Sequence, residues 1–303
     1  MTSKISIFLS NSPYPPIIVA ILGVLCYTFA HHSRNFLANL PDRLCMYTII
    51  SSAQNPTIKH ASALLTHHRT RKKSAQTVLE GVHLIDAYLA TGKMPTTLIV
   101  SDTSLEHHEV QVILGKLSIS PLVVADKLYK QIRTLGDGVD LMAIIDVPTA
   151  PMATISHDCL ILNDIQDAGN VGTLLRSASS VGIRTIITTP NTASLWSPKC
   201  LRAGMGAQFS LTMHEHLPID EILQSVKTPL YATSSHADKI IYDHDLSQSV
   251  AWVLGHEGQG VDERFLQFAT PISLPQPGGQ ESLNVGVAGS VCFYEMLRQR
   301  LYP

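Results

Sequence analysis

Short apolar runs separated by helical-looking segments are the main pattern of the chain after residue 150. Each run is continuous and bounded by turn residues, as is typical of strands buried on both faces of a parallel sheet. Strands are predicted at 159–164, 185–189, 230–234, 250–255 and 271–274. We therefore expect an open α/β sheet whose ligand lies beyond the carboxyl ends of the strands.

A C-terminal helix is predicted over residues 283–299. Apolar side chains recur there at helical spacing, at Leu283, Val287, Val291, Tyr294 and Leu297. Ser282 is the expected N-cap, because its hydroxyl can accept a hydrogen bond from a free backbone N–H. Arg298 and Arg300 suit the C-terminal end, where the helix dipole is negative.

A smaller α/β domain is predicted over residues 46–150. Apolar stretches such as TTLIVS, PLVVAD and LMAIIDV alternate there with helical-looking segments around 83–91 and 109–117. A break bracketed by two prolines then precedes the clean strand–helix alternation. We place the domain boundary there, so that residues 151–303 form the second domain.

Positive charge is concentrated near the start of the smaller domain. Between Met46 and Leu79 there is no Asp or Glu, and the basic residues are Lys59, Arg69, Arg71, Lys72 and Lys73. Such a segment is typical of a contact with a nucleic-acid backbone, although a solvated helix face has the same pattern. We prefer the nucleic-acid interpretation.

The first 45 residues form an N-terminal extension of different character. Residues 17–30 are an apolar run of 14 residues, shorter than the roughly 20 that a spanning helix needs. Three interpretations stay open: a targeting segment, a membrane anchor, or an upstream extension that precedes a true start at Met46.

The composition excludes disordered and fibrous classes of protein. The 303 residues include 22 Lys+Arg and 24 Asp+Glu, and no Gly-X-Y period is present. Five cysteines occur without a Cys-x-x-Cys pair, and fourteen histidines without an HExxH run. We therefore expect no disulfide framework, no metal and no membrane contact, and a reducing compartment, the cytoplasm.

Polar residues gather at the end of the first strand of the second domain, in NDIQDAGNVGTLLR (163–176). Asn170 stands where it could cap the following helix. Arg176 lies in a helix that is otherwise largely apolar or small, which favours a carboxylate or phosphate as its partner.

Two further strand ends combine glycine with polar residues. LGHEGQGV (254–261) follows a buried strand and carries three glycines together with Glu257. Its spacing is not the GxGxxG of a dinucleotide site. The third segment, ISLPQPGGQESLNVGVAGS (272–290), is a strand, a Pro-Gly loop and the start of the last helix. Glycine allows close approach of a ligand to the backbone, so both segments are candidate walls of a ligand site.

Taken together, these three segments resemble the motifs of the SpoU family of RNA ribose 2′-O-methyltransferases, within the knotted SPOUT superfamily. The family's D-x-Q-D-P-x-N-x-G motif and its following arginine read NDIQDAGNVGTLLR here. Its LGxEGxG turn reads LGHEGQG, and its SLNVSVA reads SLNVGVA. Ala168, His256 and Gly286 depart from the residues most often found there. Residues 46–150 are similar to the ribosomal-protein-like RNA-binding domain that many members carry.

The resemblance implies transfer of a methyl group from S-adenosylmethionine to a ribose 2′-hydroxyl without a metal. It implies that the catalytic domain is an open parallel sheet with a deep trefoil knot and that the protein is a homodimer. The cofactor would be held around Gly255, Leu274, Ser282 and Leu283. The RNA is expected to be ribosomal and to meet the basic residues of the smaller domain.

The same resemblance assigns catalytic roles to Arg176, Asn170, Glu257 and Asn284. A guanidinium is a very weak acid that stays protonated and is therefore a poor base at neutral pH, so Arg176 is expected to bind phosphate and stabilise the developing alkoxide. Glu257 is the carboxylate expected to take part in proton transfer. Asn170 and Asn284 would orient the ribose and Arg176.

Three alternatives to an rRNA methyltransferase stay open on the sequence. A tRNA 2′-O-methyltransferase would have the same motifs. A non-catalytic RNA-binding protein could keep the fold, although the candidate catalytic residues argue against it. A nucleotide-dependent oxidoreductase on an open α/β sheet lacks the early glycine fingerprint.

Overall fold

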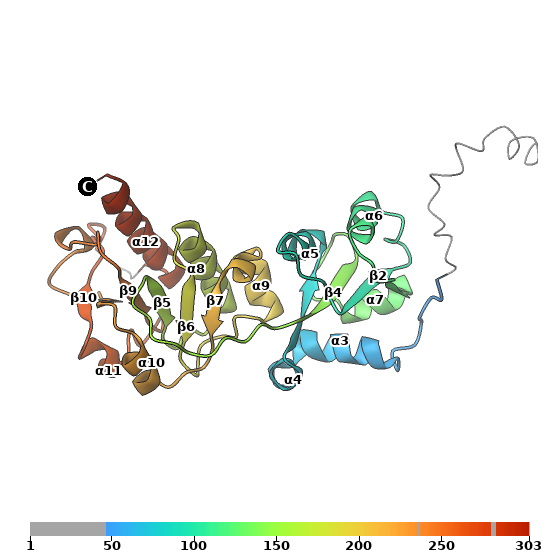
Figure 1. The fold of residues 1–303 in the computed structure, drawn as a ribbon, viewed down its shortest axis with the longest axis horizontal. Helices are drawn as coiled ribbons and strands as arrows, with labels where there is room; N and C mark the ends of the chain where they lie inside the picture. The colour runs from blue at the N-terminus through green and yellow to red at the C-terminus, as the bar shows by residue number, and fades with distance from the viewer. Residues whose placement is uncertain (1–46, 236, 280–282, 303) are drawn as a thin grey trace, which may run out of the picture. The chain divides into compact units, whose positions relative to one another are not determined.

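The computed structural model describes residues 47–235, 237–279 and 283–302 (Figure 1). The predicted extension over residues 1–45, and Met46 after it, lie outside these ranges. From Ile49 onward the chain forms one compact unit, which contains two separate sheets. Within the described ranges, each helix is too short or too polar to cross a bilayer.

The first sheet has the strand order β1-β4-β2-β3. Its strands are β1 (Gln76–Glu80), β2 (Thr97–Ser101), β3 (Leu122–Val124) and β4 (Leu141–Asp146). β4 pairs antiparallel with both β1 and β2, whereas β3 pairs parallel with β2. The helices around it are α3 (Pro56–Thr66), α4 (His68–Ser74), α5 (Val82–Leu89), α6 (His108–Gly115) and α7 (Asp126–Ile132). This mixed sheet with helices is the small α/β architecture expected for the region before residue 150.

Helices α3 and α4 carry the basic segment and differ in burial. Asn55 caps α3 by accepting hydrogen bonds from the backbone N–H groups of Thr57 and Ile58, and Pro56 occupies the first turn. The buried residues of α3 are Ile58, Ala61, Leu64 and Leu65, at the spacing of one helix face. α4 contains no buried residue. Packing therefore holds α3, while α4 is more exposed, with Thr70, Arg71 and Ser74 only partly buried.

The second sheet is entirely parallel and has the order β10-β8-β9-β5-β6-β7. Its strands are β5 (Cys159–Leu162), β6 (Thr185–Thr188), β7 (Thr212–His214), β8 (Leu230–Thr233), β9 (Ala251–Leu254) and β10 (Thr270–Ile272). The predicted open parallel sheet is confirmed, with every predicted strand present. β7 was not predicted, because a three-residue strand is too short to stand out as an apolar run.

The strand order reverses between β5 and β9. From β5 the chain moves outward to β6 and β7, then returns to the other side of β5 for β8, β9 and β10. A ligand of an open α/β sheet binds beyond the carboxyl ends of the strands at such a switch point. Asn163 follows β5, and Gly255 follows β9. The first two polar segments found in the sequence therefore meet at this position.

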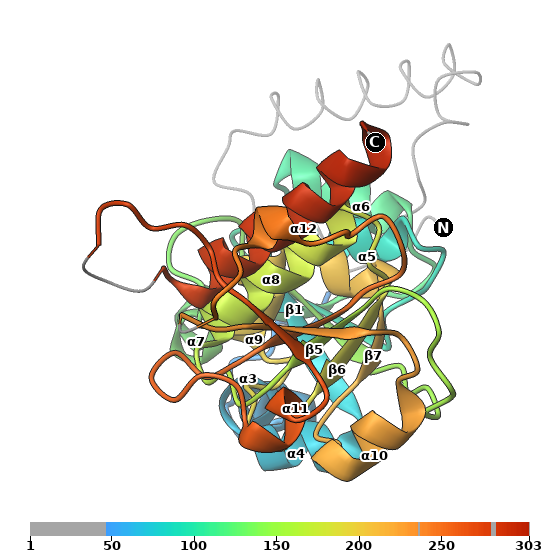
Figure 2. The ribbon, with the colours of Figure 1, turned by 90° about the vertical axis from the view of Figure 1, so that its left-hand side faces the viewer.

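Helices cover this sheet, and two of them approach each other closely. They are α8 (Ala168–Ser180), α9 (Pro198–Gly204), α10 (Ile219–Ser225), α11 (Glu263–Leu266) and α12 (Val285–Leu301), with 3₁₀ turns at Ala207–Ser210 and Ile241–Asp243. α12 lies beside α8 (Figure 1, Figure 2). A Cβ on Gly289 would lie 2.4 Å from Leu174 Cδ2, so glycine permits this contact. The third polar segment is thereby brought against the first. Whether the chain is knotted stays a prediction.

The predicted N-cap of the last helix was wrong. α12 begins at Val285, and Asn284 caps it by accepting hydrogen bonds from the N–H groups of Gly286 (2.9 Å) and Val287 (3.3 Å). Ser282 lies outside the described residues. An asparagine one residue before the helix outcompetes a more distant serine, because its carbonyl reaches two free backbone donors.

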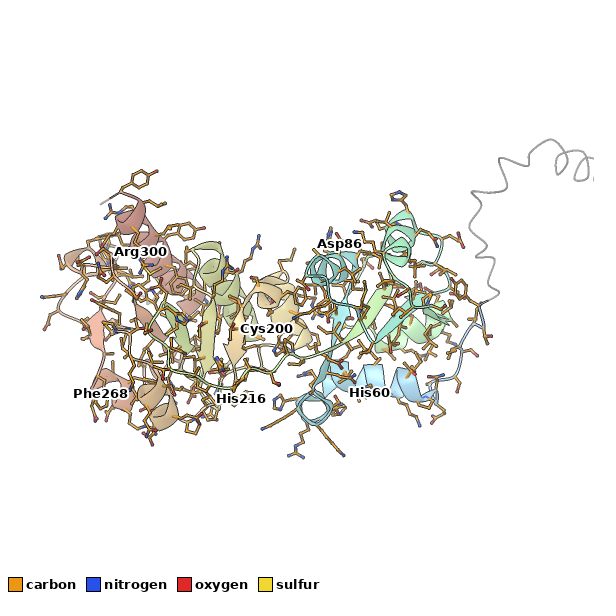
Figure 3. The ribbon with its side chains drawn as sticks, in the orientation of Figure 1. His60, Asp86, Cys200, His216, Phe268 and Arg300 are labelled. Atoms are coloured by element: carbon orange, nitrogen blue, oxygen red, sulfur yellow. The ribbon has the colours of Figure 1, made fainter. Side chains whose placement is uncertain are left out.

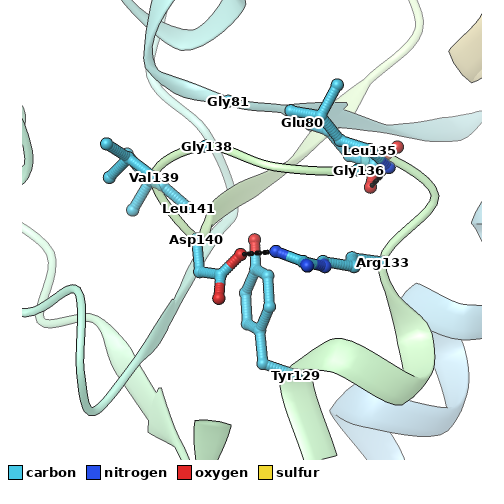
Figure 4. Close-up of a pocket in the computed structure, with 10 residues that line it drawn as sticks. All are labelled: Glu80, Gly81, Tyr129, Arg133, Leu135, Gly136, Gly138, Val139, Asp140 and Leu141. Atoms are coloured by element: carbon cyan, nitrogen blue, oxygen red, sulfur yellow. Dashed lines mark hydrogen bonds and ion pairs between the residues drawn. The ribbon is translucent and has the colours of Figure 1, made fainter.

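A buried carboxylate joins the first sheet to a helix of the second. Glu80, at the end of β1, has a side chain that is 2% exposed and pairs with Arg202 of α9 at 2.8 Å. The backbone N–H of Thr134 also donates to Glu80, at 2.8 Å. Beside it, Arg133 pairs with Asp140 at 2.7 Å (Figure 4). Glu80 and Asp140 thus each have a cationic partner.

Candidate active site

The first turn of α8 is held by an aspartate, which leaves the next polar side chain free. Asp167 Oδ1 accepts hydrogen bonds from the backbone N–H groups of Gly169 (2.8 Å) and Asn170 (2.9 Å). Lys199 also pairs with Asp167 at 2.6 Å. The hydrogen bond from Lys199, followed by those from the backbone, lowers the pKa of Asp167. Asn170 is therefore not the cap of this helix, and its amide is available for other contacts.

Asn170 links the three polar segments in one chain of hydrogen bonds. Its Nδ2 donates to Glu257 Oε1 at 2.8 Å. Its Oδ1 accepts from Asn284 Nδ2 at 2.9 Å. These residues come from α8, from the turn after β9 and from the residue that caps α12. Residues that are 87 and 114 positions from Asn170 therefore meet it at one point.

Glycine is required where the turn after β9 folds back on itself. Gly255 is buried, and a Cβ there would lie 2.2 Å from the carbonyl carbon of Gly260. Gly260 has a φ of 74°, in the left-handed region. The two glycines thus make the turn tight enough to leave Glu257 at its tip, where the side chain is exposed.

A cavity of 590 Å³ lies beside this chain of hydrogen bonds. Among the predicted cofactor-binding residues, Gly255, Leu274 and Leu283 line it, whereas Ser282 lies outside the described residues. Glu257 and Asn284 line it as well. Its volume falls in the range of about 300–1,000 Å³ that is typical of small-molecule sites. The structure therefore places three of the four predicted cofactor residues and two predicted catalytic residues around one cavity.

Arg176 stands apart from this cavity. It lies on α8, six positions after Asn170, and its side chain is exposed. Among the described residues it has no hydrogen-bond or ion-pair partner. Because every donor of the guanidinium is unused, Arg176 can bind an anionic group that approaches from solvent.

The basic residues of α3 and α4 divide into two kinds. Arg71 is half-buried, and its Nη1 donates to the carbonyl of Leu64 at 2.7 Å. Burial lowers the pKa of Arg71. The other predicted RNA-binding side chains are exposed, at Lys59, Arg69, Lys72 and Lys73. Within the described part of the chain these four form no ion pair, so their charges are open to a phosphate backbone.

Two residues that shape the site were not assigned a role from the sequence. Asn163 is 3% exposed, and its Oδ1 accepts a hydrogen bond from the backbone N–H of Asp262 at 2.7 Å. It therefore ties the end of β5 to the segment after the glycine turn. Asp164 adopts a φ of 60°, and its carboxylate accepts a hydrogen bond from Asn191 at 3.1 Å. In the sequence, a role for these two residues was indicated only by their position directly after an apolar strand.

The cysteines of the described region are not nucleophiles. Cys159, Cys200 and Cys292 are buried and free. Burial raises the pKa of each thiol to about 12, so each stays protonated near neutral pH and is a weak nucleophile. In the described ranges, no group of three or more His, Cys, Asp or Glu side chains is arranged to hold a metal ion.

Comparison with known proteins separates the chain into two matched regions. Residues 158–294 match the SpoU rRNA Methylase family. Residues 55–156 match the MRM3-like substrate binding domain. The second match falls on the first sheet and its helices, and the first match contains all three polar segments.

Similar proteins extend over most of the chain. An uncharacterized tRNA/rRNA methyltransferase of Synechocystis is 32% identical over 260 residues, which cover 83% of this chain and 94% of that protein. The 23S rRNA (guanosine(2553)-2′-O)-methyltransferase RlmP of Bacillus subtilis is 27% identical and covers 82% of this chain and 98% of its own length.

Solved structures of similar proteins have the same fold over most of the chain. A crystal structure of an RNA 2′-O ribose methyltransferase is 28% identical, covers 84% of this chain and 100% of that one, and has a TM-score of 0.70. The fold is also that of the SpoU methyltransferase AviRb of Streptomyces viridochromogenes in complex with AdoMet, with 21% identity, a TM-score of 0.73, and coverage of 82% of this chain and 100% of that one. The resemblance seen in the motifs, and the class of enzyme that it implied, are confirmed: the chain belongs to the SpoU rRNA methylase family.

Proposed function

We propose that this protein transfers the methyl group of S-adenosylmethionine to a ribose 2′-hydroxyl of ribosomal RNA. The observation that carries the proposal is the hydrogen-bonded chain Asn284–Asn170–Glu257 at the edge of the cavity. Packing alone does not require three exposed or half-exposed polar side chains from distant segments to meet. Membership of the SpoU family and the rRNA named for several relatives support the same reaction.

The cavity suits an adenosine-bearing cofactor. One wall is backbone of residues 255–261, whose N–H and C=O groups can bind a purine edge. Apolar side chains form much of the rest, at Leu266, Ile272, Leu274, Leu283 and Val285. S-adenosylmethionine supplies a methyl group on a sulfonium centre when it is bound. Gly255, Leu274 and Leu283, together with Ser282, are the residues that we propose to hold it.

Arg176 is the residue that we propose to act on the RNA. Its exposed guanidinium can bind the phosphate next to the target ribose in a two-pronged contact. The same charge stabilises negative charge that develops on the 2′-oxygen. A guanidinium has no free lone pair to accept a proton while it binds phosphate, so Arg176 is not the group proposed to take the proton.

Glu257 is the carboxylate that we propose to receive the proton, directly or through water. Its Oε1 accepts from Asn170, which fixes the direction of the carboxylate. The second oxygen, Oε2, has no partner among the described residues. Asn170 and Asn284 then act as positioning residues, and the proximity they impose contributes a large part of the rate.

We propose residues 46–150 as the RNA substrate-binding domain and residues 151–303 as the catalytic domain. The exposed charges of Lys59, Arg69, Lys72 and Lys73 supply phosphate contacts that position the RNA without reading its sequence. Arg71 belongs to the same proposed surface, with one of its nitrogens bonded to the end of α3.

A homodimer is proposed from the exposed face of α12. Apolar side chains recur along it and stay exposed, at Val287, Val291, Tyr294 and Leu301. Exposed apolar side chains that recur on one helix face are typical of an interaction surface. A second copy can cover it symmetrically, since the same helix would be present on both sides. Val291→Glu should convert the dimer to a monomer in light scattering, whereas Phe268→Glu, at an exposed site beyond α11 (Figure 3), should not.

Mapping of 2′-O-methyl groups in total RNA, with and without the protein, tests the reaction. The expected result is the loss of one ribosomal position on removal of the protein. Loss of a position in tRNA would favour the tRNA methyltransferase. No lost position, with no S-adenosylmethionine binding in calorimetry, would favour the non-catalytic RNA-binding protein.

The cytoplasm stays the proposed compartment, from the spacing of the cysteines.

A further inference from the structure

His256 makes two hydrogen bonds inside the turn that carries Glu257. Its Nδ1 accepts from the backbone N–H of Gly258 at 2.9 Å and from that of Gln259 at 3.3 Å. Its own carbonyl accepts from the N–H of Gly260 at 2.8 Å. The turn is therefore closed twice, once by the backbone and once by the imidazole.

The protonation state of His256 decides whether this closure exists. An imidazole nitrogen that accepts hydrogen bonds carries no proton, so the neutral ring holds its proton on Nε2. An imidazolium has two donors and no acceptor. Protonation would set an N–H of the ring against two backbone N–H groups and remove both hydrogen bonds.

Loss of the closed turn would affect both cofactor binding and the placement of Glu257. Residues 255–261 form one continuous wall of the cavity. The turn also sets the position from which Glu257 accepts the hydrogen bond of Asn170. A change at His256 therefore alters the cavity wall and the carboxylate together.

Few other charges stand around the turn. Glu257 lies within it, and Asp262 and Arg264 follow it and pair with each other at 3.0 Å. The residues that β8, β10, α11 and α12 and their adjoining loops contribute to the same cavity are uncharged among those described. Among the described residues that line the cavity, His256 is the only histidine and Glu257 the only charged side chain.

We propose that His256 is a positioning residue that holds the turn 256–260 through its unprotonated Nδ1, and that cofactor binding depends on this closure. The inference rests on the proposed function and deepens it by naming how the site responds to acid. Asparagine can close a turn in the same way, because its Oδ1 accepts from the backbone N–H two residues later. Asparagine does not titrate, which gives a conservative replacement that separates closure from protonation.

The test is calorimetric titration of the full chain with S-adenosylmethionine at about pH 8 and about pH 5.5. The wild type should bind about tenfold more weakly at the lower pH, as expected for the loss of the hydrogen bonds that close the wall. His256→Asn should bind as the wild type does at the higher pH and keep that affinity at the lower one. His256→Ala should be about tenfold weaker at both.

A histidine far from the cavity provides the matched control. His157 precedes β5, at the opposite ends of the parallel strands, and bonds Thr185 Oγ1 at 2.9 Å. His157→Asn should keep the acid response of the wild type. Circular dichroism at each pH establishes that every variant is folded, and the wild type and His256→Asn decide the matter should His256→Ala fail to fold.

The two levels of the proposal fail differently. An acid response in His256→Asn equal to that of the wild type would overturn the assignment to His256, as would equal affinity of all variants at both pH values. Absence of any S-adenosylmethionine binding by the wild type at the higher pH would instead overturn the proposed function itself, and the inference with it.

Discussion

Two polar clusters in this protein differ in how completely their members are satisfied. Around Glu80, a nearly buried carboxylate accepts hydrogen bonds from Arg202, from the Thr134 N–H and hydroxyl, and from the N–H of Leu135. Around Asn170, three exposed or half-exposed side chains bond one another in a line. Both carboxylate oxygens of Glu80 accept hydrogen bonds, whereas the cluster around Asn170 still has atoms that form none among the described residues.

This difference distinguishes polar residues that stabilise the fold from polar residues that remain available for catalysis. A buried carboxylate must find donors, because an unpaired one costs several kcal/mol. Side chains at the mouth of a cavity face no such demand, and Oε2 of Glu257 has no partner among the described residues. Arg176, which lies on α8 apart from the cavity, has no partner among them either. Substitutions in the first cluster should therefore lower stability, whereas those in the second should lower turnover.

Arg176→Lys should have the largest effect. Lysine keeps the positive charge but loses the planar fork, so turnover should fall about 10²–10³-fold while S-adenosylmethionine affinity and thermal stability stay unchanged. Methyl transfer to RNA under single-turnover conditions measures the effect.

Arg184→Lys is the matched control for that variant. Arg184 is exposed and donates to the hydroxyls of Ser179 (2.9 Å) and Ser210 (3.3 Å). Its replacement should leave turnover within about twofold. Near-normal turnover of Arg176→Lys would reject the role of Arg176.

Glu80→Ala should have the largest effect on stability. It leaves the N–H groups of Thr134 and Leu135 without their acceptor and removes the partner of Arg202. The free energy of unfolding should fall by about 2–3 kcal/mol, less than for a fully buried pair because Arg202 is partly exposed. Urea denaturation measures it. Replacement of Asp86 (Figure 3) in Asp86→Ala breaks its exposed pair with Lys116 and should cost less than about 0.5 kcal/mol.

Asn284 contributes both to the stability of a helix and to the candidate site. Its Oδ1 caps α12, while its Nδ2 donates to Asn170. Asn284→Asp keeps the acceptor and loses the donor, so stability should stay within about 0.5 kcal/mol while turnover falls about tenfold. Asn284→Ala should lose about 1 kcal/mol of stability as well. Equal turnover of the wild type and Asn284→Asp would show that the hydrogen bond to Asn170 is not used.

The sequence located the polar segments but not their contacts. Glycine and polar residues at strand ends identified the regions of Asn170, Glu257 and Asn284. Their meeting depends on the position of β9 next to β5, and the order of parallel strands is not encoded in any local pattern. Strand positions were predictable because fully buried strands are continuous apolar runs, and β7 escaped because it is only Thr212–His214.

The caps of α8 and α12 could not be identified from the sequence, either for Asn170, where capping was one of two interpretations, or for Ser282. Asn170 and Ser282 were chosen for their chemistry, yet the helices begin with Asp167 and Asn284 as caps. Several residues near each helix start can accept from backbone N–H groups, and only the exact start of the helix selects one of them. Because Asp167 caps α8, the amide of Asn170 is available to bond Glu257, a contact that no pattern near the helix start predicts.

Lys199→Met should have the smallest effect of these substitutions. Lys199 pairs with the exposed cap Asp167 and lowers the pKa of its carboxyl. A lowered pKa in the folded state adds stability above the unfolded value of about 3.9 and loses it as the pH falls through the folded value. Because solvent screens this pair, the loss at pH 7 should be below about 0.5 kcal/mol and should shrink as the pH falls below the unfolded value. Urea midpoints at the two pH values measure it, and a loss that persists in acid would mean that Lys199 stabilises α8 by packing instead of by charge.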